Sequence, residues 1–379
     1  MNKILFFLLI CFAISSCVTS KTTSTEPVRE IVTQIVKDTV YVAEKRKKPK
    51  NIILMIGDGM GITQISAGMY MNENNLALEE FKVIGLHKCY ADDDLITDSA
   101  AAATSFASGI KTYNGAIGVD KDKKPVKTIL EMAEDEGLAT GLVATSTIVH
   151  ATPASFIAHQ PQRKMYEEIA ADFLNTEVDL FIGGGKRYFD RRVDNRNLIE
   201  EFTKKGYQMN TFLGKSLEEL EMPTANFGYL TADTDPIPVA RGRDYLPYAS
   251  EFSCKFLDKR SPKGFFLMIE GSQIDWGGHA NDSDYIITEM LDFNESIENV
   301  LEYAKRDGNT LVVITADHET GGYAIQKGSK MGAIVGAFTS DYHTGDLIPV
   351  FAYGPGAEAF GGIYENTAIF DKLKEAFGF

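Results

Sequence analysis

The stretch NIILMIGDG, residues 51–59, decides the fold that we expect for this chain. An apolar run of this length, without alternating polar residues, is typical of a strand buried on both faces of a sheet. Similar runs follow at 140–146, 179–185, 264–271, 310–317 and 348–356, and amphipathic segments such as 126–137 and 287–308 lie between them. This alternation predicts an α/β fold with a mostly parallel central β-sheet and helices on both faces.

Polar residues directly follow three of these runs. In a mostly parallel sheet, ligands bind beyond the carboxyl ends of the strands, so these residues should lie close together. Carboxylates and imidazoles are the ligands that zinc sites use, and further candidates stand in nearby polar, Gly-flanked stretches. The candidate ligands are Asp58, Glu270, Asp317, His318, Asp275, His279, His343 and Thr152. Because Gly277 and Gly278 separate Asp275 from His279, we expect a loop there rather than a regular helical turn.

The segment ITDSAAAATSFASG, residues 96–109, predicts a second kind of site. Alanine is the best helix former and carries no bulk, so the run should be helical and open to close approach. Ser99 would lie in the first turn, near unpaired N–H groups that stabilise an anion or alkoxide. An ordinary helix cap is the alternative, because Ser, Thr and Asp are the usual N-cap residues.

The amino-terminal segment has the order of a secretory signal, with a lysine, an apolar run and small residues before a cysteine. The ending ISSC resembles the lipobox of bacterial lipoproteins, so we expect residues 1–16 to be a signal peptide and Cys17 to carry a lipid anchor. A plain signal peptide with an incidental cysteine is the alternative. Residues 17–49 read as a tether, and residues 50–379 as the catalytic domain.

The composition of the chain limits the kinds of molecule that it could bind. The chain has 379 residues and a formal net charge of −15, which argues against nucleic acid and anionic membrane surfaces as partners. After removal of the signal and lipidation of Cys17, Cys89 and Cys254 remain, and they could form one disulfide or stay as two buried thiols. His87 and His159 have no acidic neighbour in the sequence and are interpreted as structural.

Six segments together resemble the motif series of the alkaline phosphatases, in the order of that family, over roughly residues 50–379. They are NIILMIGDGMG, TDSAAAATSFASG, HATPASFIAHQPQRKMY, IEGSQIDWGGHAND, TADHETGGY and HTGDLIPVFAYGPGA. The resemblance implies a zinc-dependent enzyme that hydrolyses a broad range of phosphate monoesters and forms a phosphoserine at Ser99. It also implies a homodimer as a possible assembly, with fewer dimer contacts because the chain is short for the family.

The resemblance further assigns the ligands of three ions, two Zn²⁺ and one Mg²⁺. One zinc would be held by Asp275, His279 and His343, and the other by Asp58, Asp317 and His318. The third ion would be held by Asp58, Thr152 and Glu270. Arg163, thirteen positions after His150, matches the residue that grips the phosphate bidentately.

Two positions depart from the pattern of many bacterial members. His150 stands where they have Asp, and Trp276 where they have Lys. His150 is expected to tune the third ion, and Trp276 either tunes the site or simply packs. The alternatives are a phosphodiesterase or sulfatase of the same superfamily, or a zinc-binding lipoprotein without enzymatic activity. A sulfatase would carry its nucleophile in a different motif, and a non-enzymatic protein would not require Ser99.

Overall fold

A ten-stranded sheet forms the centre of the computed structural model, which describes residues 48–379. Its strand order, from one edge to the other, is β14 (Gly362–Glu365), β2 (Val83–Lys88), β13 (Leu347–Tyr353), β8 (Thr310–Thr315), β1 (Asn51–Gly57), β7 (Phe265–Gly271), β3 (Ala139–Thr147), β4 (Leu180–Gly184), β6 (Phe227–Leu230) and β5 (Gln208–Thr211). All six apolar runs are strands of this sheet. β13 is antiparallel to both of its neighbours, and every other pair in the sheet is parallel. The prediction of a mostly parallel sheet is therefore confirmed.

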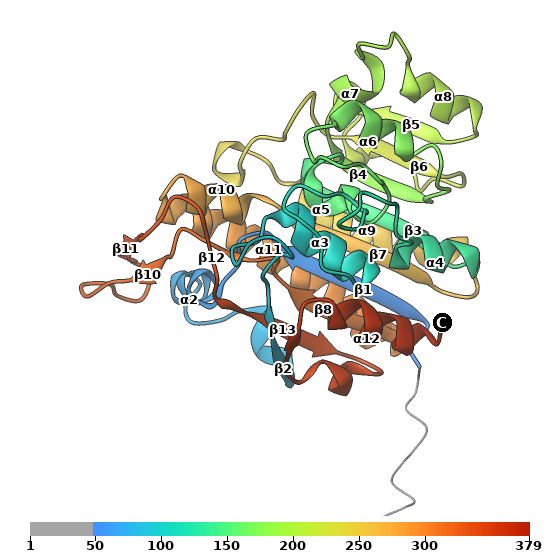
Figure 1. Ribbon diagram of the computed structural model, residues 1–379. Coiled ribbons are helices and arrows are strands. Elements are labelled where there is room, and N and C mark those ends of the chain that lie inside the picture. Colours follow the sequence, from blue (N-terminus) through green and yellow to red (C-terminus); the bar gives the residue numbers. More distant parts are fainter. Residues whose placement is uncertain (1–47) are drawn as a thin grey trace, which may run out of the picture. The chain divides into compact units, whose positions relative to one another are not determined.

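Helices cover both faces of the sheet (Figure 1). One face packs against α3 (Ser99–Ser108), α4 (Ile129–Asp135), α5 (Ala151–Ala154), α6 (Tyr166–Asp172), α7 (Lys186–Asp190), α8 (Leu198–Lys204) and α12 (Ala368–Phe377). The other face packs against α2 (Ile62–Met71), α9 (Tyr245–Arg260), α10 (Gln273–His279) and α11 (Ser283–Asp307). Short 3-10 helices are η1 (Ala77–Glu80), η2 (Leu217–Glu219), η3 (Val239–Arg241) and η4 (Ala357–Phe360).

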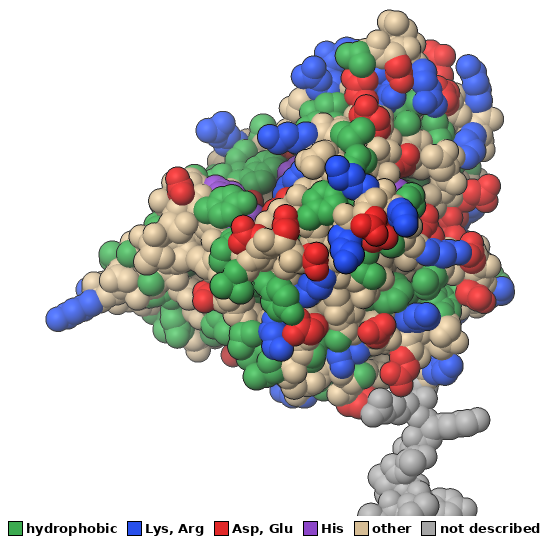
Figure 2. Space-filling model, viewed as in Figure 1, with side chains coloured by type: hydrophobic (Ala, Val, Ile, Leu, Met, Phe, Trp, Pro, Cys, Tyr) green, Lys and Arg blue, Asp and Glu red, His purple; other side chains and the backbone are tan. Residues whose placement is uncertain are grey.

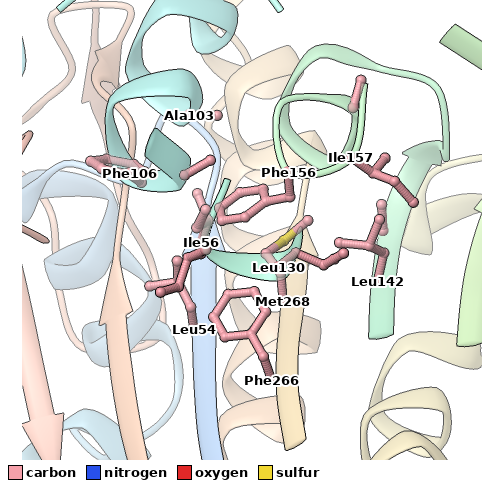
Figure 3. Packing of buried hydrophobic residues seen from close by; sticks show 14 of the residues in the cluster. Leu54, Ile56, Ala103, Phe106, Leu130, Leu142, Phe156, Ile157, Phe266 and Met268 are labelled. Atoms are coloured by element: carbon pink, nitrogen blue, oxygen red, sulfur yellow. The ribbon is translucent and has the colours of Figure 1, made fainter. Parts of the chain in front are cut away.

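The sequence of β1 is apolar from Ile52 to Ile56 because both faces of the strand are buried. Leu54 and Ile56 point to the face covered by α3, and Ile53 and Met55 point to the face covered by α11. In Figure 3, Leu54 and Ile56 lie beside Phe266 and Met268 of β7 and below Phe156. Since successive side chains alternate between two buried layers, no position of β1 can be polar without burying that polar group.

Two small sheets lie outside the main one. β9 (Glu319–Thr320) pairs antiparallel with β12 (His343–Thr344), and β10 (Ala324–Ile325) pairs antiparallel with β11 (Gly336–Ala337). The first of these carries one of the predicted metal ligands, His343.

The expectation of a loop at residues 277–278 is wrong, because both glycines lie inside the helix α10. They are required by close packing rather than by a turn. A Cβ at Gly277 would lie 2.6 Å from the backbone nitrogen of Ile286 in α11, and one at Gly278 would lie 2.8 Å from Cβ of Thr320. The glycines therefore let α10 approach its neighbours and place Asp275 and His279 one helical turn apart.

The predicted signal peptide, Cys17 and most of the predicted tether lie outside the described residues. Among residues 48–379, no helix combines the length and apolar character needed to cross a bilayer. Cys89 and Cys254 are both buried as free thiols, which decides between the two alternatives left open by the sequence.

Candidate active site

The ends of three neighbouring strands bring the carboxylates together. Asp58 follows β1, Glu270 lies near the end of β7, and Asp317 follows β8, and β1 pairs in parallel with both of the other strands. All three residues are fully buried. Their convergence is what the position of each residue at the carboxyl end of a parallel strand predicts.

The first group of candidate ligands consists of Asp275, His279 and His343, whose ligand atoms lie within 4.8 Å of one another. Nδ1 of each histidine lies 2.7 Å from a backbone carbonyl oxygen, that of Asp341 for His279 and that of Thr97 for His343. Each Nδ1 therefore donates its proton, which leaves the lone pair on Nε2. The two Nε2 atoms lie 3.2 Å apart, and both face Asp275 Oδ1 at 3.4 and 3.6 Å. Lone pairs that converge in this way fit a cation between them.

The second group consists of Asp58, Asp317 and His318, all of which are fully buried. His318 Nε2 lies 3.2 Å from Asp317 Oδ2 and 3.6 Å from Asp58 Oδ1. Among the described residues, these two carboxylate oxygens have no hydrogen-bond partner. Since buried carboxylate oxygens are costly when left unpaired, this donor set also fits a bound cation.

A third group lies beside the second and shares Asp58 with it. Glu270 and His150 place ligand atoms within 4.8 Å of Asp58. Glu270 Oε2 accepts hydrogen bonds from Ser272 Oγ at 2.6 Å and Ser146 Oγ at 3.3 Å. Glu270 Oε1, His150 Nδ1 and Thr152 Oγ1 are buried and, within the part of the chain that the structure describes, have no hydrogen-bond partner. From the sequence, we expected His150 only to tune the third ion. In the structure, one of its ring nitrogens lies within 4.8 Å of carboxylate oxygens of Asp58 and Glu270.

The ionisation of these groups reflects crowded, buried negative charge. Burial, and then the neighbouring charges of Asp317, Asp275 and Glu270, raise the pKa of Asp58 well above its usual range. Burial raises the pKa of Glu270 to about 7 and also raises the pKa of Asp317. Burial holds the pKa of His318 well below its usual range. The carboxylates therefore lack compensating positive charge from the protein, which divalent cations would supply.

Ser99 is the first residue of α3 and faces the second group. The preceding residue, Asp98, is the N-cap, and its Oδ1 accepts a hydrogen bond from the backbone N–H of Ala101 at 3.0 Å. Since Asp98 supplies the cap, the hydroxyl of Ser99 is not used for capping. It lies 3.4 Å from both Asp58 Oδ2 and His318 Nε2 and is almost completely buried.

Arg163 lies at the same site and is held by two contacts. Its Nη1 donates to Asp98 Oδ2 at 2.9 Å, and its Nη2 lies 3.3 Å from His150 Nε2. Burial, and then the charge of Arg163, lower the pKa of His150 to about 3, so this imidazole is neutral. The role of Asp98 was not predicted from the sequence, although its place before the alanine-rich helix marks it as a cap.

A cleft of about 470 Å³ opens onto one side of the site. Its walls include Ser99, Arg163 and the first group of ligands, and Trp276 packs edge-on against His150 with 6.3 Å between the ring centroids. Figure 2 views a face on which histidine atoms reach the surface beside hydrophobic side chains. The cleft therefore admits a small molecule to Ser99 from outside.

The remaining histidines lie apart from this site. His87 Nε2 lies 2.9 Å from the carbonyl oxygen of Ala316, and its ring packs edge-on against Phe106. His159 has an acidic partner in space that the sequence did not reveal, since its Nε2 lies 3.0 Å from Glu131 Oε1. Both histidines hold the fold together and contribute no atom to the three groups.

Comparison with known proteins identifies the class of enzyme. A family model described as alkaline phosphatase matches residues 49–336. Alkaline phosphatase 3 of Bacillus subtilis is 35% identical over 86% of this chain and 90% of the relative. The solved alkaline phosphatase from the Antarctic bacterium TAB5 is 44% identical, with a TM-score of 0.82 over 87% of this chain and 98% of that structure. A histidine-to-aspartate variant of that enzyme, with Mg bound in its M3 site, is 43% identical with a TM-score of 0.83 over the same shares.

The fold and the matched relatives define a hydrolase of the phosphatase class, and the buried carboxylates and histidines form groups that could hold metal ions. The chain belongs to the alkaline phosphatase family, and its activity is the hydrolysis of phosphate monoesters.

The raised pKa of Glu270 gives a prediction about stability. Since its pKa rises from 4.5 to about 7 in the fold, the metal-free protein loses stability as the pH rises through this range. At pH 8 in chelator, Glu270→Gln should therefore raise the melting temperature, because it removes a buried charge that costs on the order of 3 kcal/mol. With zinc and magnesium added, the wild type should be the more stable of the two.

The control for this comparison is Glu134→Gln. Burial also raises the pKa of Glu134 to about 7, but its carboxylate bonds Thr140 at the start of β3, away from the candidate ligands. The change in melting temperature caused by Glu134→Gln, measured by differential scanning fluorimetry, should be the same with and without metal. If Glu270→Gln shows no reversal between the two conditions, Glu270 does not interact with a metal ion.

Proposed function

We propose that the chain hydrolyses phosphate monoesters through a phosphoserine at Ser99, with two Zn²⁺ and a third ion bound beside it. The observation that carries this proposal is the position of the Ser99 hydroxyl, 3.4 Å from two candidate ligands and at the base of a cleft that also contains Arg163. A phosphoryl group in this cleft would contact the nucleophile and the guanidinium together.

The first zinc would be held by Asp275, His279 and His343, and the second by Asp58, Asp317 and His318. The third ion would be held by Asp58, Glu270 and Thr152, and His150 would lie near it. When bound, the ions offset the negative charge of the carboxylates and of the substrate, and they stabilise the attacking and leaving oxygens. A phosphate dianion should therefore bind the metal-loaded protein, despite the net charge of −15.

The residues of the chain carry the covalent steps. Ser99 Oγ, as the alkoxide, attacks phosphorus, the bond to the ester oxygen breaks, and the alcohol leaves with a proton from solvent. Water then attacks the phosphoserine, which returns the electron pair to Ser99 Oγ and releases inorganic phosphate. The amino end of α3 favours the negative charge on Ser99 in both steps.

Arg163 would hold the transferred group in place. Asp98 and His150 contact one N–H of each terminal nitrogen, and each terminal nitrogen carries a second N–H that can donate to phosphate oxygens. All of these contacts fall on the phosphoryl group and none on the alcohol, which supports a broad range of monoester substrates.

We propose magnesium for the third ion, with His150 and Trp276 as residues that tune it. The magnesium bound in the M3 site of the histidine-to-aspartate variant of the TAB5 enzyme supports this reading. An imidazole among oxygen ligands favours a softer ion than an all-oxygen set does. We therefore expect His150 to weaken the preference for magnesium in this chain.

We also propose an exported, membrane-anchored protein. Residues 1–16 would be removed as a signal peptide, Cys17 would carry the lipid, and residues 17–49 would tether the catalytic domain, 50–379, at the periplasmic face or the cell surface. A homodimer remains the proposed assembly from the family resemblance.

Ser99→Ala should lower kcat/KM for an aryl phosphate monoester by about 10³-fold or more, because no phosphoserine can form. The zinc content should stay unchanged, since Ser99 lies beside the ligands and replaces none of them. Ser105→Ala, which removes another buried hydroxyl of α3, should retain activity within a few-fold. Retained turnover in Ser99→Ala, with no phosphoserine in acid-quenched samples of the wild type, would disprove the serine mechanism.

Arg163→Ala should distinguish a monoesterase from a diesterase. A monoester has three nonbridging oxygens, so two can accept from the guanidinium while one faces the metals, whereas a diester has only two. Charge-assisted hydrogen bonds contribute roughly 1.5 to 3 kcal/mol each, so kcat/KM for the monoester should fall on the order of 10- to 1000-fold. The diester rate should change far less, and Lys164→Ala controls for a general loss of positive charge in the cleft. An equal loss for both substrates would contradict the assignment.

Cys17→Ala should move the protein from the membrane fraction to the soluble fraction, because the lipid is the proposed anchor. Partition into a detergent phase, followed by activity measurement in each phase, tests this. Cys11→Ala, inside the predicted signal, should partition as the wild type does. If Cys17→Ala stays in the detergent phase, Cys17 is not the lipidation site.

A further inference from the structure

The hydroxyl of Thr320 contacts one candidate ligand from each of the two zinc groups. Its Oγ1 lies 2.5 Å from Asp275 Oδ1 in the first group and 3.2 Å from His318 Nδ1 in the second. Thr320 is fully buried, so water does not compete for these contacts. It was not among the residues that the sequence singled out.

The proton positions at this hydroxyl follow from what each partner can do. A carboxylate only accepts hydrogen bonds, so Thr320 donates its single proton to Asp275 Oδ1. The contact with His318 then requires Nδ1 to carry the proton and to donate it to Thr320 Oγ1. His318 Nε2 is left with its lone pair, which faces Asp317, Asp58 and Ser99. The hydroxyl therefore selects the tautomer of His318 in which Nε2 can bind a metal.

Backbone pairing, a hydrogen bond and close packing hold Thr320 in this position. It lies in β9, where its backbone pairs with His343 of β12, another ligand of the first group. Gln64 Nε2 donates to the carbonyl oxygen of Thr320 at 2.9 Å. A Cβ at Gly59 would lie 2.8 Å from Thr320 Oγ1, and one at Gly278 would lie 2.8 Å from its Cβ, so two glycines make room for this side chain.

We infer that Thr320 is a positioning residue shared by both zinc sites, which orients Asp275 and fixes the tautomer of His318 through one hydroxyl. This inference rests on the proposed function, because it presupposes that the two groups bind zinc. Loss of the hydroxyl should weaken both sites together, whereas loss of a ligand weakens chiefly the site to which it belongs.

The test measures zinc affinity rather than turnover. Thr320→Val keeps the shape of the side chain and removes the hydroxyl, and Thr320→Ser keeps the hydroxyl. Each variant is stripped of metal and titrated with zinc against a chromophoric chelator. Thr320→Val should bind both zinc ions 10- to 100-fold more weakly than the wild type, which is the range for lost partners of metal ligands. Thr320→Ser should stay within about threefold of the wild type.

Thr344→Val is the matched control in the same small sheet. Thr344 Oγ1 donates to Glu319 Oε2 and contacts no candidate ligand, so its loss disturbs β12 and β9 without touching the metal groups. It should keep the zinc affinity of the wild type. If Thr320→Val binds zinc as the wild type does, or if Thr344→Val loses as much affinity, the inference is wrong.

A second measurement does not depend on how the variants fold. In the metal-free wild type with ¹⁵N-labelled histidine, the chemical shifts of the ring nitrogens report the tautomer, and the chain has only six histidines. His318 should carry its proton on Nδ1, and a proton on Nε2 would overturn the inference. If the wild type binds no zinc, the proposed metal assignment itself fails, whereas a failure confined to Thr320→Val leaves that assignment intact.

Discussion

The burial of Asp58 beside other carboxylates is the constraint on which the rest of this structure depends. Asp58 directly follows β1, which lies between β7 and β8 in the sheet. Glu270 and Asp317 lie at the same ends of those two neighbouring strands, and all three residues are fully buried. Burial, and then the neighbouring carboxylates, raise the pKa of Asp58, so the ionised form of this group is disfavoured without a cation beside it. Such a site is useful to a phosphatase because divalent cations both relieve the repulsion and attract a phosphate dianion.

Asp98 connects Ser99 with Arg163. One oxygen of its carboxylate caps α3 directly before Ser99, and the other accepts from Arg163. One side chain therefore contacts both the start of the helix that carries Ser99 and the guanidinium of Arg163. The alanines that follow Ser99 are buried and small, which lets the helix start lie close to Asp58 and His318.

The glycines of the site serve packing as much as turns. Gly277 and Gly278 lie inside α10, where Gly277 lies against the backbone of α11 and Gly278 lies against Thr320. This packing explains why a sequence that suggests a loop forms a helix here. Local propensity is weak when close contact between two backbones excludes every residue with a Cβ.

The sequence by itself determined the α/β class, the six strands with apolar runs, and the convergence of Asp58, Glu270 and Asp317, because buried parallel strands have a recognisable pattern and end at one edge. It did not reveal β2, β5, β6 and β14, which are short or only partly buried at the sheet margins. Nor did it reveal that His150 lies beside Asp58 and Glu270, that Thr320 contacts both Asp275 and His318, or that Asp98 contacts both the start of α3 and Arg163. These depend on segments far apart in the chain, and only tertiary packing decides which atoms of such segments meet.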